Sequence, residues 1–192
     1  MTGDATLGAV VEARAYEDDK GRKRLALAIR SDLTIEAQTT APGATWLDRQ
    51  LLTRDPLIAS TGFGADVRTA MAARADYLIE EGLGRRQGQR VIFARDLLAT
   101  LRGRELEEAT AKLAADRGLA HQPLAEGQPV AGIYRERVTL SSGRFAMIDD
   151  GLGFQLVPWR PALEQHLGQE VRGIATASGI EWSFGRKRGL GL

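Results

Sequence analysis

The sequence predicts an α+β protein: a winged-helix-like middle, consisting of a long helix and an arginine-tipped hairpin, followed by a small SH3-like or OB-like β-barrel. Three observations lead to this fold class. Apolar residues alternate with period two near both ends of the chain, which favours strands. Two segments with helical apolar spacing flank a short, arginine-rich hairpin pattern in the middle. Finally, Asp150-Gly151 stands between two apolar runs, and this dipeptide is among the strongest short-range hairpin signals.

Composition limits the classes of function. The 192 residues are 43% hydrophobic, which suffices for one sizeable core or two or three small ones. The formal net charge is only +1, so any anion binding has to come from local clusters. The absence of cysteine excludes disulfides, thiolate zinc sites and cysteine nucleophiles. No signal-peptide or transmembrane pattern is present, which predicts a soluble, cytoplasmic protein with no membrane partner.

The patterns divide the chain into three segments. Residues 1–43 are predicted to form an N-terminal β-hairpin and a linker. In the second strand of this hairpin, Leu25, Leu27 and Ile29 share one face, and the residues between them share the other. Residues 44–120 are predicted to form the helical, winged-helix-like domain. Residues 121–192 are predicted to form the small β-barrel-like domain with a basic tail.

The middle segment shows clear helix boundaries. Thr45 is a candidate N-cap for a short helix that ends near Leu52. A longer helix is predicted from about 65 to 81, and a hairpin of two short strands that meet at Gln87-Gly88 follows it. Asp96 opens another long helix, in which the apolar stripe breaks near Gly103 and predicts a kink or a change of packing partner.

The last segment is predicted to be rich in strands. A linker covers about 121–129, and a strand follows over 130–140. Two further strands flank Asp150-Gly151, and a short helix is expected over 161–167. A final hairpin pairs 171–175 with 180–184. Five short strands and one helical turn fit a small barrel.

The strongest charge asymmetry lies between residues 85 and 104, where six arginines stand against one acid and give a local charge of +5. One interpretation is a wing that contacts phosphates; the other is a solvated hairpin tip beside a polar helix face, since winged helices also serve as protein-contact modules. The basic tail has two interpretations as well: a loose terminus or an arm that binds phosphate. The predicted nucleic-acid-binding residues are Arg68, Arg74, Arg85, Arg86, Arg90, Arg186, Lys187 and Arg188.

No catalytic, metal or cofactor site is predicted. Asp149-Asp150 has no third acid nearby and precedes glycine, so a turn is favoured over a cation site. None of the Gly-Leu-Gly triplets completes a dinucleotide fingerprint. The histidines His121 and His166 are isolated. The excess of arginine over lysine suits phosphate recognition, but a GC-rich coding sequence produces the same excess.

Five phrases occur in an order and spacing that resemble the C-terminal region of bacterial conjugative relaxases, or mobilisation nucleases. They are ATWLDRQL (44–51), EGLGRRQGQRVI (81–92), GRFAMIDDGLGF (143–154), VPW (157–159) and WSFGRKRGLG (182–191). In that family this region is a domain without assigned function that follows the nicking domain, and the resemblance spans nearly all of the chain.

The resemblance implies a role in plasmid or integrative-element transfer. The nicking chemistry of the relaxases uses a tyrosine nucleophile and a histidine-rich metal cluster, and this sequence contains neither. We therefore expect a non-enzymatic tail portion, present as a fragment or a separate reading frame, that aids the binding of DNA, with single-stranded DNA as one candidate. The alternative is a protein-docking module for the coupling protein, the secretion machinery or the relaxase nuclease domain.

Overall fold

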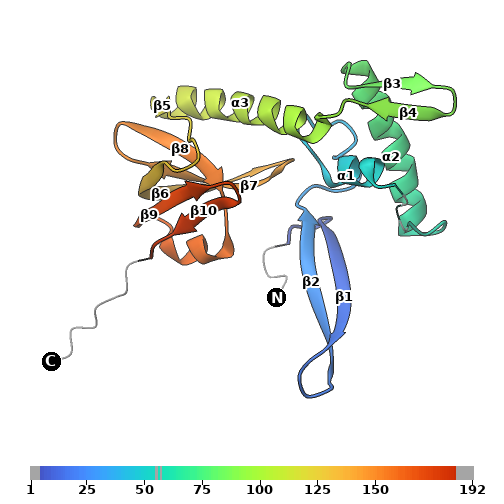
Figure 1. Cartoon of the computed structure of the whole chain (residues 1–192), viewed down its shortest axis with the longest axis horizontal. Coiled ribbons are helices and arrows are strands. Elements are labelled where there is room, and N and C mark those ends of the chain that lie inside the picture. Colours follow the sequence, from blue (N-terminus) through green and yellow to red (C-terminus); the bar gives the residue numbers. More distant parts are fainter. Residues whose placement is uncertain (1–4, 55, 57, 185–192) are drawn as a thin grey trace. The chain divides into compact units, whose positions relative to one another are not determined.

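The computed structural model describes residues 5–54, 56 and 58–184, and it shows a mixed α+β protein (Figure 1). The chain forms two compact units, of which the first ends at Glu105 and the second begins at Leu106. The predicted N-terminal segment lies in the first unit, and the predicted strand-rich segment lies in the second. The boundary falls inside a helix, 15 residues before the end predicted for the middle segment.

The first unit contains two hairpins and helices. Its elements are β1 (Val10–Glu17), β2 (Lys23–Ser31), α1 (Trp46–Leu52), α2 (Phe63–Glu80), β3 (Gly84–Gln87), β4 (Arg90–Phe93) and the first part of α3 (Leu97–Arg117). β1 and β2 pair antiparallel, as predicted. Asp18 closes their turn by accepting the N–H groups of Lys20 and Arg22 at 3.0 Å each. The hydrogen bond from the Arg22 backbone is the main cause of the lowered pKa of Asp18.

A capping box fixes the start of α1, as predicted from Thr45. The Thr45 hydroxyl accepts the N–H of Asp48 at 3.3 Å, and Asp48 Oδ2 accepts the N–H of Thr45 at 2.7 Å. These two bonds satisfy donors that the helix itself leaves unpaired. Both residues are buried, so the cap belongs to the interior of the unit.

α2 carries the core of the first unit on two sides. Leu78 packs in a cluster with Leu83, Leu97 and Leu101, which joins α2 to the start of α3. Val67 and Ala70 pack with Leu47 of α1, and Trp46 lies partly buried against this second cluster. The apolar spacing of α2 therefore serves two separate clusters, and its observed bounds lie one or two residues from those predicted.

α3 runs unbroken through Gly103, and the division between the units falls two residues later. The break in its apolar stripe therefore lies close to the division between the units, and the kink predicted as one alternative is not present. A Cβ on Gly103 would meet nothing within 4 Å, and the backbone there has an ordinary negative φ.

Gly103→Ala is expected to stabilise the protein by about 0.5–1 kcal/mol, because alanine restricts the unfolded chain and suits a helix interior better than glycine. Urea titration followed by circular dichroism measures this gain. A loss of stability would show that α3 needs glycine at this point.

The second unit is built on one six-stranded sheet. Its elements are β5 (Ala120–His121), β6 (Pro129–Leu140), β7 (Gly143–Asp149), β8 (Gly153–Pro158), the 3-10 helix η1 (Pro161–His166), β9 (Glu170–Thr176) and β10 (Gly179–Trp182). The strand order is β10-β9-β6-β7-β8-β5. The hairpin around Asp150-Gly151 forms as predicted: Asp150 Oδ1 accepts the N–H groups of Leu152 and Gly153 at 2.9 and 2.8 Å. The hydrogen bond from Leu152 is the main cause of the lowered pKa of Asp150.

The second unit was predicted to be a small SH3-like or OB-like β-barrel, but its sheet does not close into a barrel. β10 and β5 are the two edges of the sheet and do not pair with each other in the described part of the chain, so the sheet is open. The predicted linker also contains a strand: His121 in β5 pairs parallel with Phe154 in β8. This strand has two residues and a partner more than thirty positions away, so local patterning gives no sign of it.

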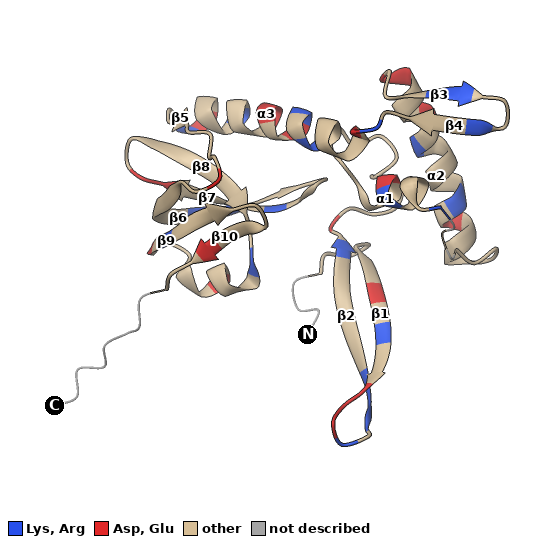
Figure 2. Cartoon of the chain, in the orientation of Figure 1, with Lys and Arg blue, Asp and Glu red and all other residues tan. Residues whose placement is uncertain are grey.

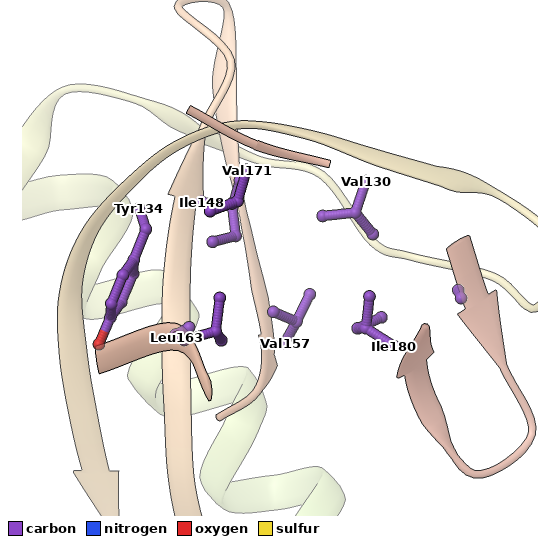
Figure 3. Close-up of a cluster of buried hydrophobic side chains, with 9 residues drawn as sticks. Val130, Tyr134, Ile148, Val157, Leu163, Val171 and Ile180 are labelled. Carbon is purple, nitrogen blue, oxygen red and sulfur yellow. The ribbon is translucent and has the colours of Figure 1, made fainter. Parts of the chain in front are cut away.

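One face of the sheet holds the largest apolar cluster of the second unit (Figure 3). Tyr134, Ile148 and Val157 contribute from three adjacent strands, and Leu163 of η1 covers them. Trp159 and Trp182 are partly buried against this cluster, as expected for core anchors. No helix in the described part of the chain is both long and apolar enough to cross a membrane.

Candidate nucleic-acid interface

The β3–β4 hairpin carries three of the predicted contact residues, and its register divides them between two faces. The strands join through the two-residue loop Gly88-Gln89, and Gly88 has a φ of 59°, which glycine adopts readily. Arg85 is paired with Ile92, and Arg86 with Val91. Because neighbouring residues of a strand point to opposite faces, Arg85 and Arg86 are on opposite faces.

The face that carries Arg86 is turned toward α2. Arg86 forms an ion pair with Asp76 of α2. Phe93, on the same face, packs against the cluster that contains Leu78. Gly84 lies close to both helix and strand, since a Cβ there would be 3.1 Å from Phe93 and 3.5 Å from Ile79. This face holds the hairpin to the helix, and Arg86 takes part in that attachment.

The opposite face presents two arginines to solvent. Gln87 pairs directly with Arg90, so Arg85 and Arg90 share this face with Gln87 and Ile92, and all four are exposed. The two arginines are diagonal neighbours, with Cβ atoms about 7–8 Å apart by ladder geometry. Neither forms an ion pair with any residue that the structure describes. Figure 2 shows the basic residues on both strands. Two unneutralised cations on one face give it a local positive charge.

The exposed surface of α2 carries one basic residue. Arg68 is exposed, and its guanidinium donates to the carbonyl of Ile58 at 2.8 Å. The other exposed charged residues of α2 are acidic: Asp66, Asp76 and Glu80. A helix with this charge does not suit the phosphate-lined major groove, so within α2 and the β3–β4 hairpin the outer face of the hairpin is the more positive surface.

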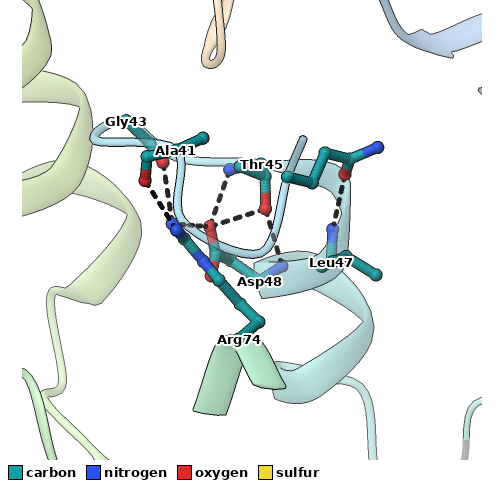
Figure 4. Close-up of polar contacts among 7 residues, drawn as sticks. Ala41, Gly43, Thr45, Leu47, Asp48 and Arg74 are labelled. Atoms are coloured by element: carbon teal, nitrogen blue, oxygen red, sulfur yellow. Dashed lines mark hydrogen bonds and ion pairs between the residues drawn. The ribbon is translucent and has the colours of Figure 1, made fainter. Parts of the chain in front are cut away.

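Arg74, in contrast, is not a surface residue. Its side chain is fully buried, and so is that of its partner Asp48 (Figure 4). The prediction that Arg74 contacts nucleic acid is therefore wrong. Val67, Ala70, Arg74 and Leu78 follow helical spacing and are all buried, so Arg74 occupies the apolar stripe of α2. That spacing was the available signal for its burial.

The buried guanidinium joins three segments of the first unit. Nε and Nη2 donate to the two carboxylate oxygens of Asp48 at 2.8 and 2.9 Å. Nη1 donates to the carbonyl of Ala41 at 2.6 Å, and Nη2 donates to that of Gly43 at 2.9 Å. The same carboxylate caps α1 through Thr45. Arg74 is thus a structural residue that connects α2, α1 and the loop before α1.

Two further arginines of the 85–104 segment also have partners. Arg104 lies 3.8 Å from Glu81, and Arg102 also has interactions of its own. The predicted tail residues Arg186, Lys187 and Arg188 lie outside the described residues.

The sequence analysis did not predict that Gln87 and Ile92 belong to the exposed outer face of the β3–β4 hairpin. The length of the Gly88-Gln89 loop is the signal that fixes their register.

Within the described residues, no group of three or more histidine, aspartate or glutamate side chains is placed to hold a metal ion. The Asp149-Asp150 pair acts as a turn, as predicted. Asp149 Oδ1 accepts the N–H of Gly151 at 2.7 Å, and its Oδ2 accepts a hydrogen bond from Arg135 at 2.9 Å. Both carboxylates therefore have structural partners.

Comparison with curated proteins and with solved structures gives no match. A family model described as "protein of unknown function (DUF3363)" matches residues 9–191, which is nearly the whole chain and covers both units. The protein therefore belongs to the DUF3363 family.

Proposed function

We propose that the chain is a non-catalytic accessory region that holds DNA through the outer face of the β3–β4 hairpin. The resemblance to the C-terminal region of conjugative relaxases makes plasmid or integrative-element transfer the process in which it would act. In this proposal the bound DNA is single-stranded or duplex DNA handled by a relaxase.

One observation carries the proposal: Arg85 and Arg90 share an exposed face and have no carboxylate partner in the described chain. Arginine provides planar donors that suit phosphate oxygens. As diagonal neighbours with long side chains, the two arginines can reach neighbouring phosphates of one strand.

The order of α2, the β3–β4 hairpin and α3 supports a winged-helix-like interpretation, with the hairpin as the wing. In winged helices the wing contacts the sugar–phosphate backbone. Because the exposed charges of α2 are mainly acidic, we propose that the hairpin acts without a groove-reading helix. The contact would then be independent of DNA sequence, since phosphates carry no sequence information.

Replacing Arg85 and Arg90 with alanine is expected to weaken DNA binding and its dependence on salt. Two lost phosphate contacts correspond to a change in the slope of log K against log salt of about 1.4 for single strands and about 1.8 for duplex. Fluorescence anisotropy with labelled oligonucleotides, measured over a salt series, gives both slopes. The affinities measured at equal salt in the same titrations indicate which form of DNA the hairpin prefers.

Arg86→Ala is the matched control, because it removes the same charge from the opposite face of the same hairpin. We expect it to leave the slope almost unchanged. If the double variant and wild type have equal slopes, or if wild type binds no oligonucleotide at low salt, the proposed contact is wrong. The protein-docking alternative would then be favoured.

A further inference from the structure

The β1–β2 hairpin has one apolar face that is exposed from Ala13 and Leu27 to the tip. Its register places cross-strand pairs on this face in four successive levels: Val11 with Ile29, Ala13 with Leu27, Ala15 with Leu25, and Glu17 with Lys23. The opposite face carries the charged residues Glu12, Arg14, Arg24 and Arg30, with two intramolecular ion pairs to Glu12. Figure 1 shows the long two-stranded ribbon that these residues form.

The apolar face is exposed along most of its length. Leu25 is 61% exposed, Leu27 is 43% exposed and Val11 is 38% exposed. Burial is confined to the base of the hairpin, at Val10 and Ser31. A two-stranded hairpin is marginal by itself, and apolar surface of this kind gains free energy when a second surface removes it from water.

We propose that the second surface is the same face of another copy of this chain, in a parallel, two-fold symmetric pair of hairpins. This inference concerns β1–β2 and does not depend on the DNA contact proposed for β3–β4. A two-fold axis along the strands places β1 of one copy over β2 of the other at equal levels. Ala13 then lies over the partner copy's Leu27, and Ala15 over its Leu25, so small residues meet large ones on both sides.

The cross-strand pair of Glu17 and Lys23 at the tip of the hairpin also supports the parallel arrangement. With the axis along the strands, Glu17 of each copy faces Lys23 of the other, which gives two attractive pairs per dimer. In the opposite arrangement, with the hairpins pointing in opposite directions, Glu17 would lie over Val11 and Lys23 over Ile29. That arrangement would bury both charges against apolar side chains, which costs free energy. Charge and shape therefore select the parallel pair.

The expected dimer is reversible. The face of one hairpin is smaller than the roughly 800 Å² per partner that standard interfaces bury. We therefore expect a mass that rises with concentration from 20.8 kDa toward twice this value. Sedimentation velocity on the full chain, across a wide range of concentration, measures this rise.

Two charge reversals test the arrangement itself. Glu17→Lys alone and Lys23→Glu alone each place like charges opposite each other, twice per dimer, and we expect each to weaken self-association by roughly tenfold. An equimolar mixture of the two variants places Lys opposite Glu at both positions. The mixture should dimerise as well as wild type, and only contacts between copies can produce this rescue.

Leu27→Glu is expected to abolish the dimer, and Ala26→Glu, on the opposite face, is its matched control. Both positions are exposed, and circular dichroism checks that each variant keeps its fold. A wild-type chain that stays monomeric at every concentration would overturn the proposal. So would a mixture of the two charge reversals that shows no recovery, or a dimer that Leu27→Glu leaves intact.

Discussion

Arg74→Ala is expected to lower the free energy of unfolding of the first unit by about 3–5 kcal/mol, which is the usual cost of removing one partner from a fully buried ion pair. Arg74 and Asp48 are both 0% exposed, so water cannot replace the lost partner. The substitution also leaves the carbonyls of Ala41 and Gly43 without their donor. Urea titration followed by tryptophan fluorescence and circular dichroism measures the loss.

Arg68→Ala provides the control on the same helix. Its guanidinium is exposed and makes one hydrogen bond to a carbonyl, so we expect a loss of at most about 1 kcal/mol. The double variant Asp48→Ala/Arg74→Ala should cost less than the sum of the two single variants, because the second change removes a group that the first left unpaired. A small effect of Arg74→Ala, similar to that of Arg68→Ala, would contradict the structural role.

Gly132→Ala is expected to destabilise the second unit by about 3 kcal/mol, because the added methyl group has no space. A Cβ at this position would lie 2.4 Å from the carbonyl oxygen of Asp149 and 2.7 Å from its carbon. These are backbone atoms of β7, and a rotamer change cannot move them away. Gly132 also pairs with Val171 on β9, so β6 is held on both sides at this point.

Thermal or urea unfolding of Gly132→Ala measures this loss. Gly103→Ala is the natural comparison, since the same methyl group enters open space there and should stabilise. If both variants shift stability in the same direction, steric contact at Gly132 is not the cause. If Gly132→Ala costs less than about 1 kcal/mol, β6 and β7 can separate more easily than their geometry indicates.

Local patterns predicted the elements of this fold well. The alternation of Leu25, Leu27 and Ile29 predicted β2, Thr45 predicted the start of α1, and Asp150-Gly151 predicted the turn between β7 and β8. Each of these signals acts between residues close in sequence, where backbone geometry dominates.

The missed features depend on distant partners. A closed or open sheet is decided by whether its edge strands meet, and β5 depends on a parallel partner in β8. At the candidate site, residue type predicted a group of exposed arginines. The carboxylate partner of each arginine, which residue type does not reveal, determines its role. Arg74 pairs with a buried carboxylate and Arg86 with an exposed one on α2. The two arginines on the outer face of the β3–β4 hairpin have no carboxylate partner in the described chain. An arginine alone does not reveal which of these applies.

Because α3 is one unbroken helix across the boundary between the units, neither unit can be separated at that boundary without cutting a ladder of i to i+4 hydrogen bonds. A chain shortened at Glu105 would expose four carbonyls in mid-helix, whereas one that ends at Gly118 would keep the natural stop of the helix. Limited proteolysis should accordingly spare residues 97–117 and cut elsewhere first. Because the hydrogen-bond ladder of α3 is continuous, unfolding of either part of this helix would remove hydrogen bonds from the other part.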